Sequence, residues 1–167
     1  MIVSEKWREL SKRCCGAVRW KCAAKQEEHM RRKDREVTDK NQIEEILKQC
    51  KTCHVAMVDN EKPYVVPLSY GYQILEDGTL ELVFHSAKDG KKINILKKNP
   101  NVCFEISMEG EPIYADVPCK SGYYYSSVIG YGKVEFLDNV QEKCKALSLM
   151  YYQQAGKRVE FQEAHIK

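Results

Sequence analysis

Two β-rich runs joined by a four-residue polar turn constrain the fold more than any other part of the sequence. The runs Cys53–Val58 and Tyr64–Tyr72 are rich in Val, Met, Leu and Tyr, and Asp59-Asn60-Glu61-Lys62 separates them. A short polar link between two such runs is typical of a β-hairpin, in which the two strands are antiparallel. The chain is therefore expected to build an antiparallel sheet.

Further runs of the same kind extend the hairpin along the chain. Turn residues and β-rich composition predict strands at Thr79–His85, Val102–Ile106 and Tyr123–Leu137, with a Gly- and Pro-marked loop from Met108 to Gly122. Apolar residues at helical spacing predict helices over 39–50, from about Gly90 to Asn99, and from Asn139 onward. Strands in hairpin order with helices outside them predict an α+β, mainly β fold, arranged as a small antiparallel barrel.

The basic charge of the chain is concentrated near its N-terminus. The first 36 of the 167 residues hold eleven Lys and Arg against six Asp and Glu, whereas the remainder holds sixteen against eighteen. This length fits one domain, and the nearly neutral remainder argues against a nucleic-acid partner. We therefore divide the chain into a basic arm over residues 1–29, helical or disordered, and a domain over residues 30–167.

Eight cysteines raise the question of metal or disulfide chemistry. Lys and Arg interrupt the first 24 residues throughout, and no apolar run is long enough for a membrane span, so we expect a cytoplasmic protein with reduced thiols and no membrane partner. Cys50-Lys-Thr-Cys53-His54 has the spacing of half a zinc site, but no second pair of ligands follows. Both cysteines fall at positions typical of core packing. We predict no metal site and a structural role for His54.

Three lysines surround the start of the predicted helix near Gly90. Lys88, Lys91 and Lys92 follow a strand that ends at Phe84-His85-Ser86. A helix N-terminus carries partial positive charge and unsatisfied N–H groups, so it favours acidic residues over lysines. Either the lysines extend into water, or they and Ser86 bind an anion such as a phosphate. The residues alone leave these two interpretations evenly matched, and no GxGxxG or P-loop motif is present.

Four segments, taken in order, resemble one known family. They are MRRKDRE (30–36), VAMVDNEKPYVVPLSYGY (55–72), LVFHSAKDGKKINILKKNPNVCFEI (82–106) and SSVIGYGKVEF (126–136). Together they resemble the 5-nitroimidazole resistance (Nim) proteins of the pyridoxamine 5′-phosphate oxidase-like, FMN-binding split-barrel superfamily. The resemblance covers about residues 30–153. It implies an antiparallel split β-barrel of Greek-key type with flanking helices.

The resemblance also implies an FMN at the interface of a homodimer. The strand over residues 65–69 would line the flavin ring through backbone groups, and the end of the next strand would face the cofactor. The lysines would hold the phosphate, which favours the anion interpretation, and a segment of the partner subunit would complete the site. The implied cofactor-binding residues are Val65, Val66, Pro67, Leu68, Ser69, Phe84, His85, Ser86, Lys88, Lys91, Lys92, Ser126 and Ser127.

The function implied by the resemblance is that of a small FMN-dependent reductase of nitroaromatic or related acceptors. Nim proteins place a histidine at the motif of His85 beside the flavin, so His85 is the expected catalytic residue, which positions the substrate or donates a proton. A reduced nicotinamide is the expected electron donor. The alternatives are a flavin-binding carrier or sensor without turnover, and a haem-binding relative of the same barrel with His54 or His85 as the axial ligand.

The sequence also departs from the family at both ends. Residues 1–29 precede the usual family start at Met30. The family normally has a further strand after its last helix, and Ala164–Lys167 is too short to supply one. The basic and aromatic residues with which pyridoxamine phosphate oxidases hold their substrate near the C-terminus are absent, so that activity is not expected.

Overall fold

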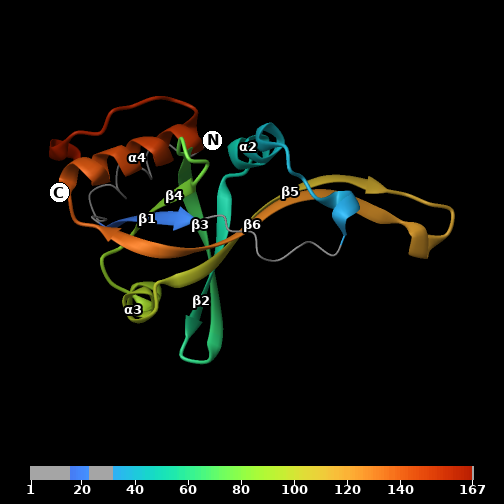
Figure 1. Cartoon of the computed structure of the whole chain (residues 1–167), viewed down its shortest axis with the longest axis horizontal. Coiled ribbons are helices and arrows are strands. Elements are labelled where there is room, and N and C mark those ends of the chain that lie inside the picture. Colours follow the sequence, from blue (N-terminus) through green and yellow to red (C-terminus); the bar gives the residue numbers. More distant parts are fainter. Residues whose placement is uncertain (1–15, 23–31, 167) are drawn as a thin grey trace.

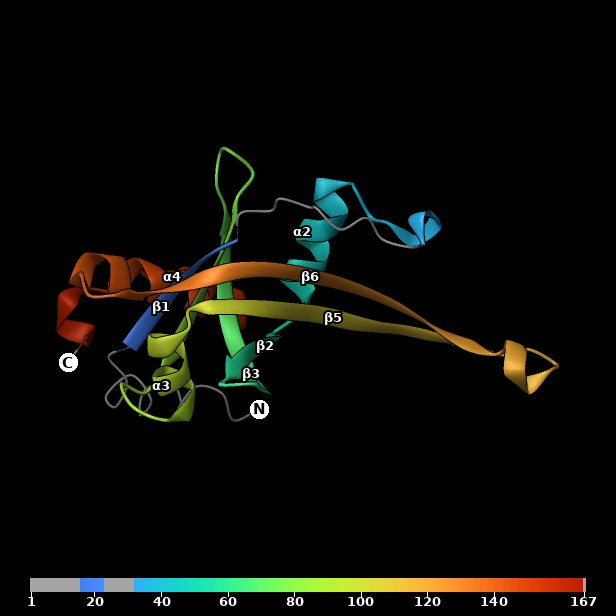
Figure 2. The ribbon, with the colours of Figure 1, turned by 60° about the horizontal axis from the view of Figure 1, so that its bottom comes forward.

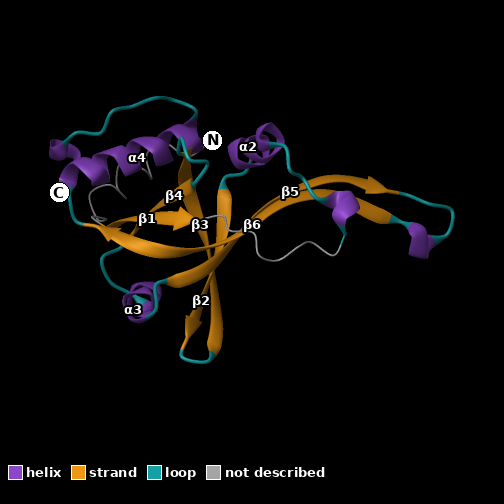
Figure 3. Ribbon diagram, viewed as in Figure 1, coloured by secondary structure: helices purple, strands orange, loops and turns teal. Residues whose placement is uncertain are grey.

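The computed structural model describes residues 16–22 and 32–166, in which six antiparallel strands form a closed barrel in the order β1-β4-β3-β2-β5-β6. The strands are β1 (Gly16–Cys22), β2 (Thr52–Asp59), β3 (Lys62–Ile74), β4 (Leu80–Ser86), β5 (Asn101–Ile113) and β6 (Gly122–Leu137). The helices are α2 (Lys40–Gln49), α3 (Lys91–Lys98) and α4 (Val140–Ala155), with single turns at Lys33–Arg35, Pro118–Lys120 and Glu163–His165. The three helices lie outside the barrel, which confirms the predicted fold class (Figures 1 and 3).

Local side chains fix the ends of two helices. The Asp39 side chain accepts a hydrogen bond from the backbone N–H of Asn41 at 3.0 Å, and the Asn139 side chain accepts one from Glu142 at 3.1 Å. These bonds satisfy N–H groups that the first turn leaves unpaired. Gly156 ends α4 in the left-handed conformation, with φ of 68°. The helices predicted from residue 39 and from Asn139 are therefore confirmed.

Alternation along the strands decides which side chains fill the barrel. Cys53, Val55 and Met57 of β2 are buried, while His54 and Val58 between and beyond them are exposed. This is the period of two expected when one face of a strand packs on a core. The same core cluster contains Tyr70, Leu82, Phe84, Val102, Phe104 and Ile106 from the other strands and Ile46, Leu47, Ile95 and Leu96 from the helices.

Helix α4 covers the outside of β3, β4 and β1. Beneath it, Val83 and Leu137 pack with Ala146 and Met150 in a second buried cluster. The helix approaches β3 so closely at Gly71 that an added Cβ there would lie 2.5 Å from the backbone nitrogen of Met150. A side chain of any size at this position would collide with the backbone of α4.

A charged group is buried under the same helix. Glu81 of β4 is only 3% exposed. Gln73 donates a hydrogen bond to its carboxylate, and Arg19 of β1 lies 4.0 Å from it. Arg19 also donates a 3.0 Å hydrogen bond to Glu142 of α4. Arg19 therefore links β1 to both β4 and α4 by salt bridges.

The expectation of an arm over residues 1–29 does not hold for its middle part. Residues 16–22 form β1, which pairs from Gly16–Ser86 to Cys22–Leu80 with β4 and from Ala17–Leu137 to Lys21–Lys133 with β6. The barrel therefore includes a strand that precedes the predicted domain boundary at residue 30, because β4 and β6 each offer an edge that β1 can pair. The remaining residues of the predicted arm lie outside the described residues.

The loop expected from Met108 to Gly122 is shorter than predicted, because its first part is strand. β5 continues to Ile113 and β6 begins at Gly122, with a register irregularity between Glu109 and Pro112. A bulge can accommodate a proline because the local ladder is already interrupted there. The two strands extend from the barrel as a long hairpin arm, whose tip lies far from α4 (Figure 2).

After α4, the described residues 157–166 contain no strand. Among the described helices, none is long and apolar enough to cross a membrane.

Candidate functional site

The strand β3 changes partners halfway along its length. Residues 62–69 pair with β2, and residues 70–74 pair with β4. Among the described residues, the first half of β3 therefore has no strand on the side of β4. An antiparallel strand paired on one side presents alternate N–H and C=O groups on the other. The predicted ring-binding residues 65–69 lie along this open edge, which offers backbone groups to a ligand.

His85 lies at the point where β3 and β4 separate. Tyr70 and Phe84 are the last cross-strand pair, so Ser69 and His85 follow on their respective strands just beyond it. Phe84 is buried in the core, His85 is partly buried, and Ser86 is buried with its hydroxyl donating to the carbonyl of Ala87 at 3.0 Å. The structure therefore brings the predicted strand-end residues to the open edge of β3.

The start of α3 carries the predicted phosphate-binding lysines. Gly90 is the N-cap residue, with φ of 128° and no side-chain capping hydrogen bond. Lys91 extends toward the β2–β3 turn, where its Nζ lies 3.2 Å from Asp59 Oδ2 and 4.5 Å from the centre of the Tyr64 ring. Lys92 lies close enough to His85 to affect its charge. Lys88 is exposed in the preceding loop. Lys92 is thus the lysine that the structure brings to His85.

The protonation of His85 follows from this environment. Burial, and second the positive charge of Lys92, lower the pKa of His85 below its usual value. Burial disfavours the charged imidazolium, and a like charge adds to this effect. At neutral pH the imidazole is therefore neutral. A neutral imidazole can accept one hydrogen bond and donate another, which suits a positioning role better than the delivery of a proton.

Ser126 and Ser127 do not lie with the other predicted residues. They pair with Met108 and Ser107 of β5, at the root of the hairpin arm. Strands β2 and β5 separate them from β3 within one chain. Within one chain the two serines are therefore not sheet neighbours of residues 65–69.

A histidine and a carboxylate that sequence reasoning did not connect lie together on β2 and β5. His54 Nδ1 is 3.2 Å from Glu105 Oε2, and the two residues are direct cross-strand partners. Both side chains occupy outward positions on strands with an alternating pattern. This alternation was the one feature of the sequence that could have placed them on the same face of the sheet. Their contact needs the register of two strands 51 positions apart.

The cysteines behave as packing residues. Burial raises the pKa of Cys53 to about 12, and burial also raises the pKa of Cys50. The Cys50 thiol donates a hydrogen bond to the carbonyl of Ser107 at 3.2 Å. In the described part of the chain, no three His, Cys, Asp or Glu side chains gather in a way that could hold a metal ion. These thiols are therefore neutral and unreactive at neutral pH.

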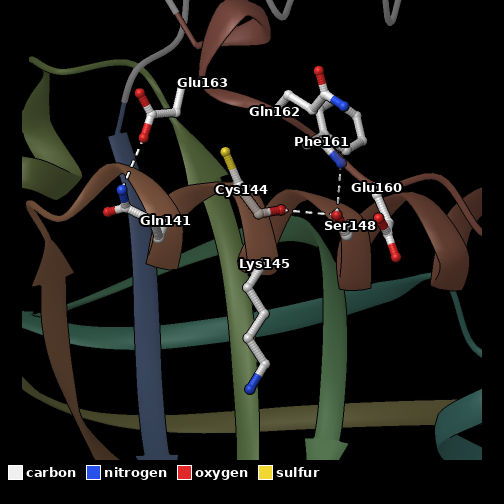
Figure 4. A pocket seen from close by; sticks show the side chains of 8 residues that line it. All are labelled: Gln141, Cys144, Lys145, Ser148, Glu160, Phe161, Gln162 and Glu163. Carbon is white, nitrogen blue, oxygen red and sulfur yellow. Dashed lines mark hydrogen bonds between the residues drawn. The ribbon is translucent and has the colours of Figure 1, made fainter.

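A surface cleft of about 540 Å³ lies between α4 and the segment that follows it. Its polar groups bond to one another (Figure 4): Gln141 donates to Glu163 at 2.8 Å, and the Ser148 hydroxyl accepts the N–H of Phe161 at 3.1 Å. These contacts fasten residues 160–163 to the helix. None of the lining residues belongs to the predicted cofactor set, so the cleft is separate from the candidate site.

Residues 39–164 match the pyridoxamine 5′-phosphate oxidase family, and the chain belongs to that family. A candidate 5-nitroimidazole antibiotic resistance protein from Bacteroides thetaiotaomicron shares 31% sequence identity with it, at a TM-score of 0.65. That alignment covers 78% of this chain and 75% of the other. The resemblance inferred from the four sequence segments and the split-barrel fold are therefore confirmed.

Two further solved structures share the fold. The FAD and haem binding protein of Mycobacterium smegmatis has 15% identity, a TM-score of 0.62, and coverage of 78% of this chain and 63% of that one. The flavocytochrome Anf3 of Azotobacter vinelandii has 16% identity, a TM-score of 0.62, and coverage of 82% and 64%. The chain thus spans less than two thirds of either protein. No curated protein matches the chain in sequence.

Proposed function

We propose that the protein binds FMN along the open edge of β3 and acts as a small flavin-dependent reductase of nitroaromatic or related acceptors. The observation that carries this proposal is the arrangement of backbone and charge where β3 separates from β4. Among the described residues, the edge of β3 over residues 65–69 has no strand on the side of β4 and lies next to the strand end at His85, whose pKa the charge of Lys92 on α3 lowers. Membership of the family and the likeness to a candidate nitroimidazole resistance protein support it.

The residues present fit a phosphorylated flavin. The flavin ring system carries several hydrogen-bonding atoms along its rim, which alternate backbone N–H and C=O groups of a strand edge can match. The phosphate carries roughly −1.5 to −2 charges. The N-terminus of α3 has N–H groups without a side-chain cap, and Lys92 adds a positive charge beside it. This combination favours binding of the phosphate at the start of α3. The flavin ring would then bind along the strand edge.

The chain's own groups would orient the acceptor and exclude water. A bound flavin supplies the electron pair for the reduction. His85, neutral at neutral pH, would hydrogen-bond an acceptor oxygen and hold it in place. A reduced nicotinamide is the proposed source of electrons for the flavin. A flavin carrier without turnover would use the same binding groups but would leave an acceptor unchanged.

We further propose that two copies assemble through the outer face of β2, β5 and β6. This face exposes apolar side chains that include Val58, Ile129 and Tyr131, and the hairpin arm exposes Tyr123, Tyr124 and Tyr125. Tyrosine is enriched at protein interfaces, and the buried core of an interface is more apolar than the rest of the surface. Assembly through this face would also bring Ser126 and Ser127 of one copy to the flavin of the other.

Lys92→Ala is expected to weaken FMN binding about 10- to 150-fold, the equivalent of the roughly 1.5–3 kcal/mol that a charge-assisted hydrogen bond contributes. Riboflavin lacks the phosphate, so its affinity should change little. Titration of the apoprotein with each flavin, followed by flavin fluorescence, measures both constants. Lys97→Ala, an exposed lysine near the other end of α3, is the matched control and should leave both affinities unchanged.

Equal losses for FMN and riboflavin would show that Lys92 does not hold the phosphate. Absence of flavin binding, with a Soret band on haem addition instead, would contradict the proposed cofactor. Reoxidation of the chemically reduced, FMN-loaded protein by a nitroimidazole separates a reductase from a carrier. A carrier would retain its reduced flavin in the presence of the acceptor.

Ile129→Glu is expected to convert a dimer into a monomer at micromolar concentration and to weaken FMN binding at least tenfold. Ile129 is 62% exposed in the single chain, so the charge would not disturb the barrel itself but would be buried at the proposed interface. Sedimentation velocity measures the assembly state. Val159→Glu, on an exposed residue after α4, should remain dimeric. A wild-type monomer that binds FMN fully would refute the proposed assembly.

A further inference from the structure

His54 and Glu105 form a pair on the outer face of the sheet for which packing gives no reason. Their side chains are 50% and 34% exposed. Even a fully charged exposed pair would stabilise a fold by only about 0–1 kcal/mol, so this contact adds little to the barrel. The inward neighbours Cys53 and Val55 supply the packing of this part of β2. The pair is therefore available for a chemical role on this face of the sheet.

The strand register places this pair beside the proposed flavin strand. His54 lies directly opposite Pro67 of β3 on one side and Glu105 of β5 on the other. Pro67 is the middle residue of the segment 65–69 that forms the open edge. The imidazole thus stands one strand away from that edge, on the face that a second copy would cover.

The contact also fixes how the imidazole is oriented. A carboxylate beside Nδ1 holds the proton on that nitrogen and turns Nε2 away from it. Among the described residues, Nε2 has no hydrogen-bond partner. The side chains on the next row of this face are Val65, Ala56, Cys103 and Tyr131. Glu105 is thus the one carboxylate next to His54, and Cys103 and Tyr131 are its other titratable neighbours on this face.

We propose that His54 delivers a proton to the acceptor that is reduced beside the flavin, with Glu105 as its positioning partner. This inference rests on the proposed function.

The proton from His54 is one of two that the reduction of a nitro group requires. Reduction of a nitro group to a nitroso group takes up two electrons and two protons and releases water. A bound, reduced flavin would supply the electron pair and one proton. His54 would supply the other as an imidazolium: Nε2 first takes up a proton from solvent, and that Nε2–H bond breaks as an O–H bond forms on the acceptor oxygen. The imidazole then takes up another proton from solvent, while Glu105 keeps the ring in place through its contact with Nδ1.

The first test asks whether His54 lies near the flavin, without reference to activity. The side-chain NMR signals of His54 are assigned by their loss in His54→Gln and followed as FMN is added to the apoprotein. The His54 signals should shift, whereas those of His165, on the segment after α4, should not. FMN binding without a shift of the His54 signals would overturn the inference and leave the proposed function intact.

The second test measures single-turnover reoxidation by a nitroimidazole. His54→Gln should keep FMN affinity and slow reoxidation by about 10²-fold, the lower range for general acid assistance. Added imidazole should restore part of the rate in His54→Ala, which a purely structural role would not allow. Glu105→Gln should slow the step by about tenfold, and His165→Gln should not slow it. Reoxidation at the wild-type rate in His54→Gln would overturn the inference. Failure of the wild-type protein to bind FMN would remove the proposed function, and this inference with it.

Discussion

Replacing Arg19 with methionine is expected to destabilise the barrel by about 3–5 kcal/mol, because the change leaves the buried carboxylate of Glu81 without a positive partner. Glu81 is 3% exposed, and apart from Arg19 its described side-chain contact is the hydrogen bond from Gln73. The same change removes the 3.0 Å contact between Arg19 and Glu142 on α4. Urea unfolding followed by circular dichroism measures the loss.

The matched control removes the charge that Arg19 neutralises. In the double variant Arg19→Met with Glu81→Gln, no charge remains buried, so most of the lost stability should return. Glu81→Gln alone leaves Arg19 partly exposed and bonded to Glu142, and it should cost less than Arg19→Met. If Arg19→Met unfolds at the same urea concentration as the wild type, then Arg19 does not neutralise Glu81 and β1 is not held in the barrel by this contact.

Gly71→Ala is expected to cost about 3 kcal/mol, near the upper end for overpacking of a buried site. The added methyl group would lie 2.5 Å from the backbone nitrogen of Met150 and 2.6 Å from the backbone carbon of Leu149. Neither atom belongs to a side chain that could rotate away, so α4 itself would have to shift. Thermal unfolding measures the effect as a lower midpoint.

Gly122→Ala is the control for this substitution. A Cβ at Gly122 would meet the Cδ1 atom of Ile113 at 3.8 Å, which is an ordinary contact. The residue also lies in a strand, where alanine costs about 0.5–1 kcal/mol less than glycine in conformational entropy. Equal destabilisation by the two variants would show that the closeness of α4 to Gly71 is not what limits that position.

Local patterns predicted most of the fold because the signals for most helices and strands lie within a few neighbouring residues. The polar turn at Asp59–Lys62 and the helical spacing in 39–50 depend on neighbouring residues alone. Strand β1 could not be predicted in this way, because it is short, lies in a basic segment, and pairs with strands far along the chain. Residues 108–113 of the hairpin arm were predicted as loop because Gly110 and Pro112 normally break strands, whereas a register irregularity between Glu109 and Pro112 accommodates them here.

In the candidate site, too, some contacts follow from neighbouring residues and others depend on the whole fold. The group around His85 and Lys92 lies within one short stretch, so its members could be named together from the sequence. That Lys91 instead contacts Asp59 and Tyr64 depends on where α3 packs, which no local pattern fixes. The pair His54 and Glu105 depends on the register between β2 and β5, and register is set by the whole sheet.

The position of β1 has a consequence for how the protein is made. During synthesis the N-terminal residues leave the ribosome first, yet β6, one of the two neighbours of β1, is the last strand to emerge. Until β6 is available, β1 can complete only its ladder with β4, and β1 and β5 keep open edges that can pair with other chains. The closing of the barrel must therefore wait until translation has passed Leu137. A nascent chain stalled before that residue should be prone to aggregate.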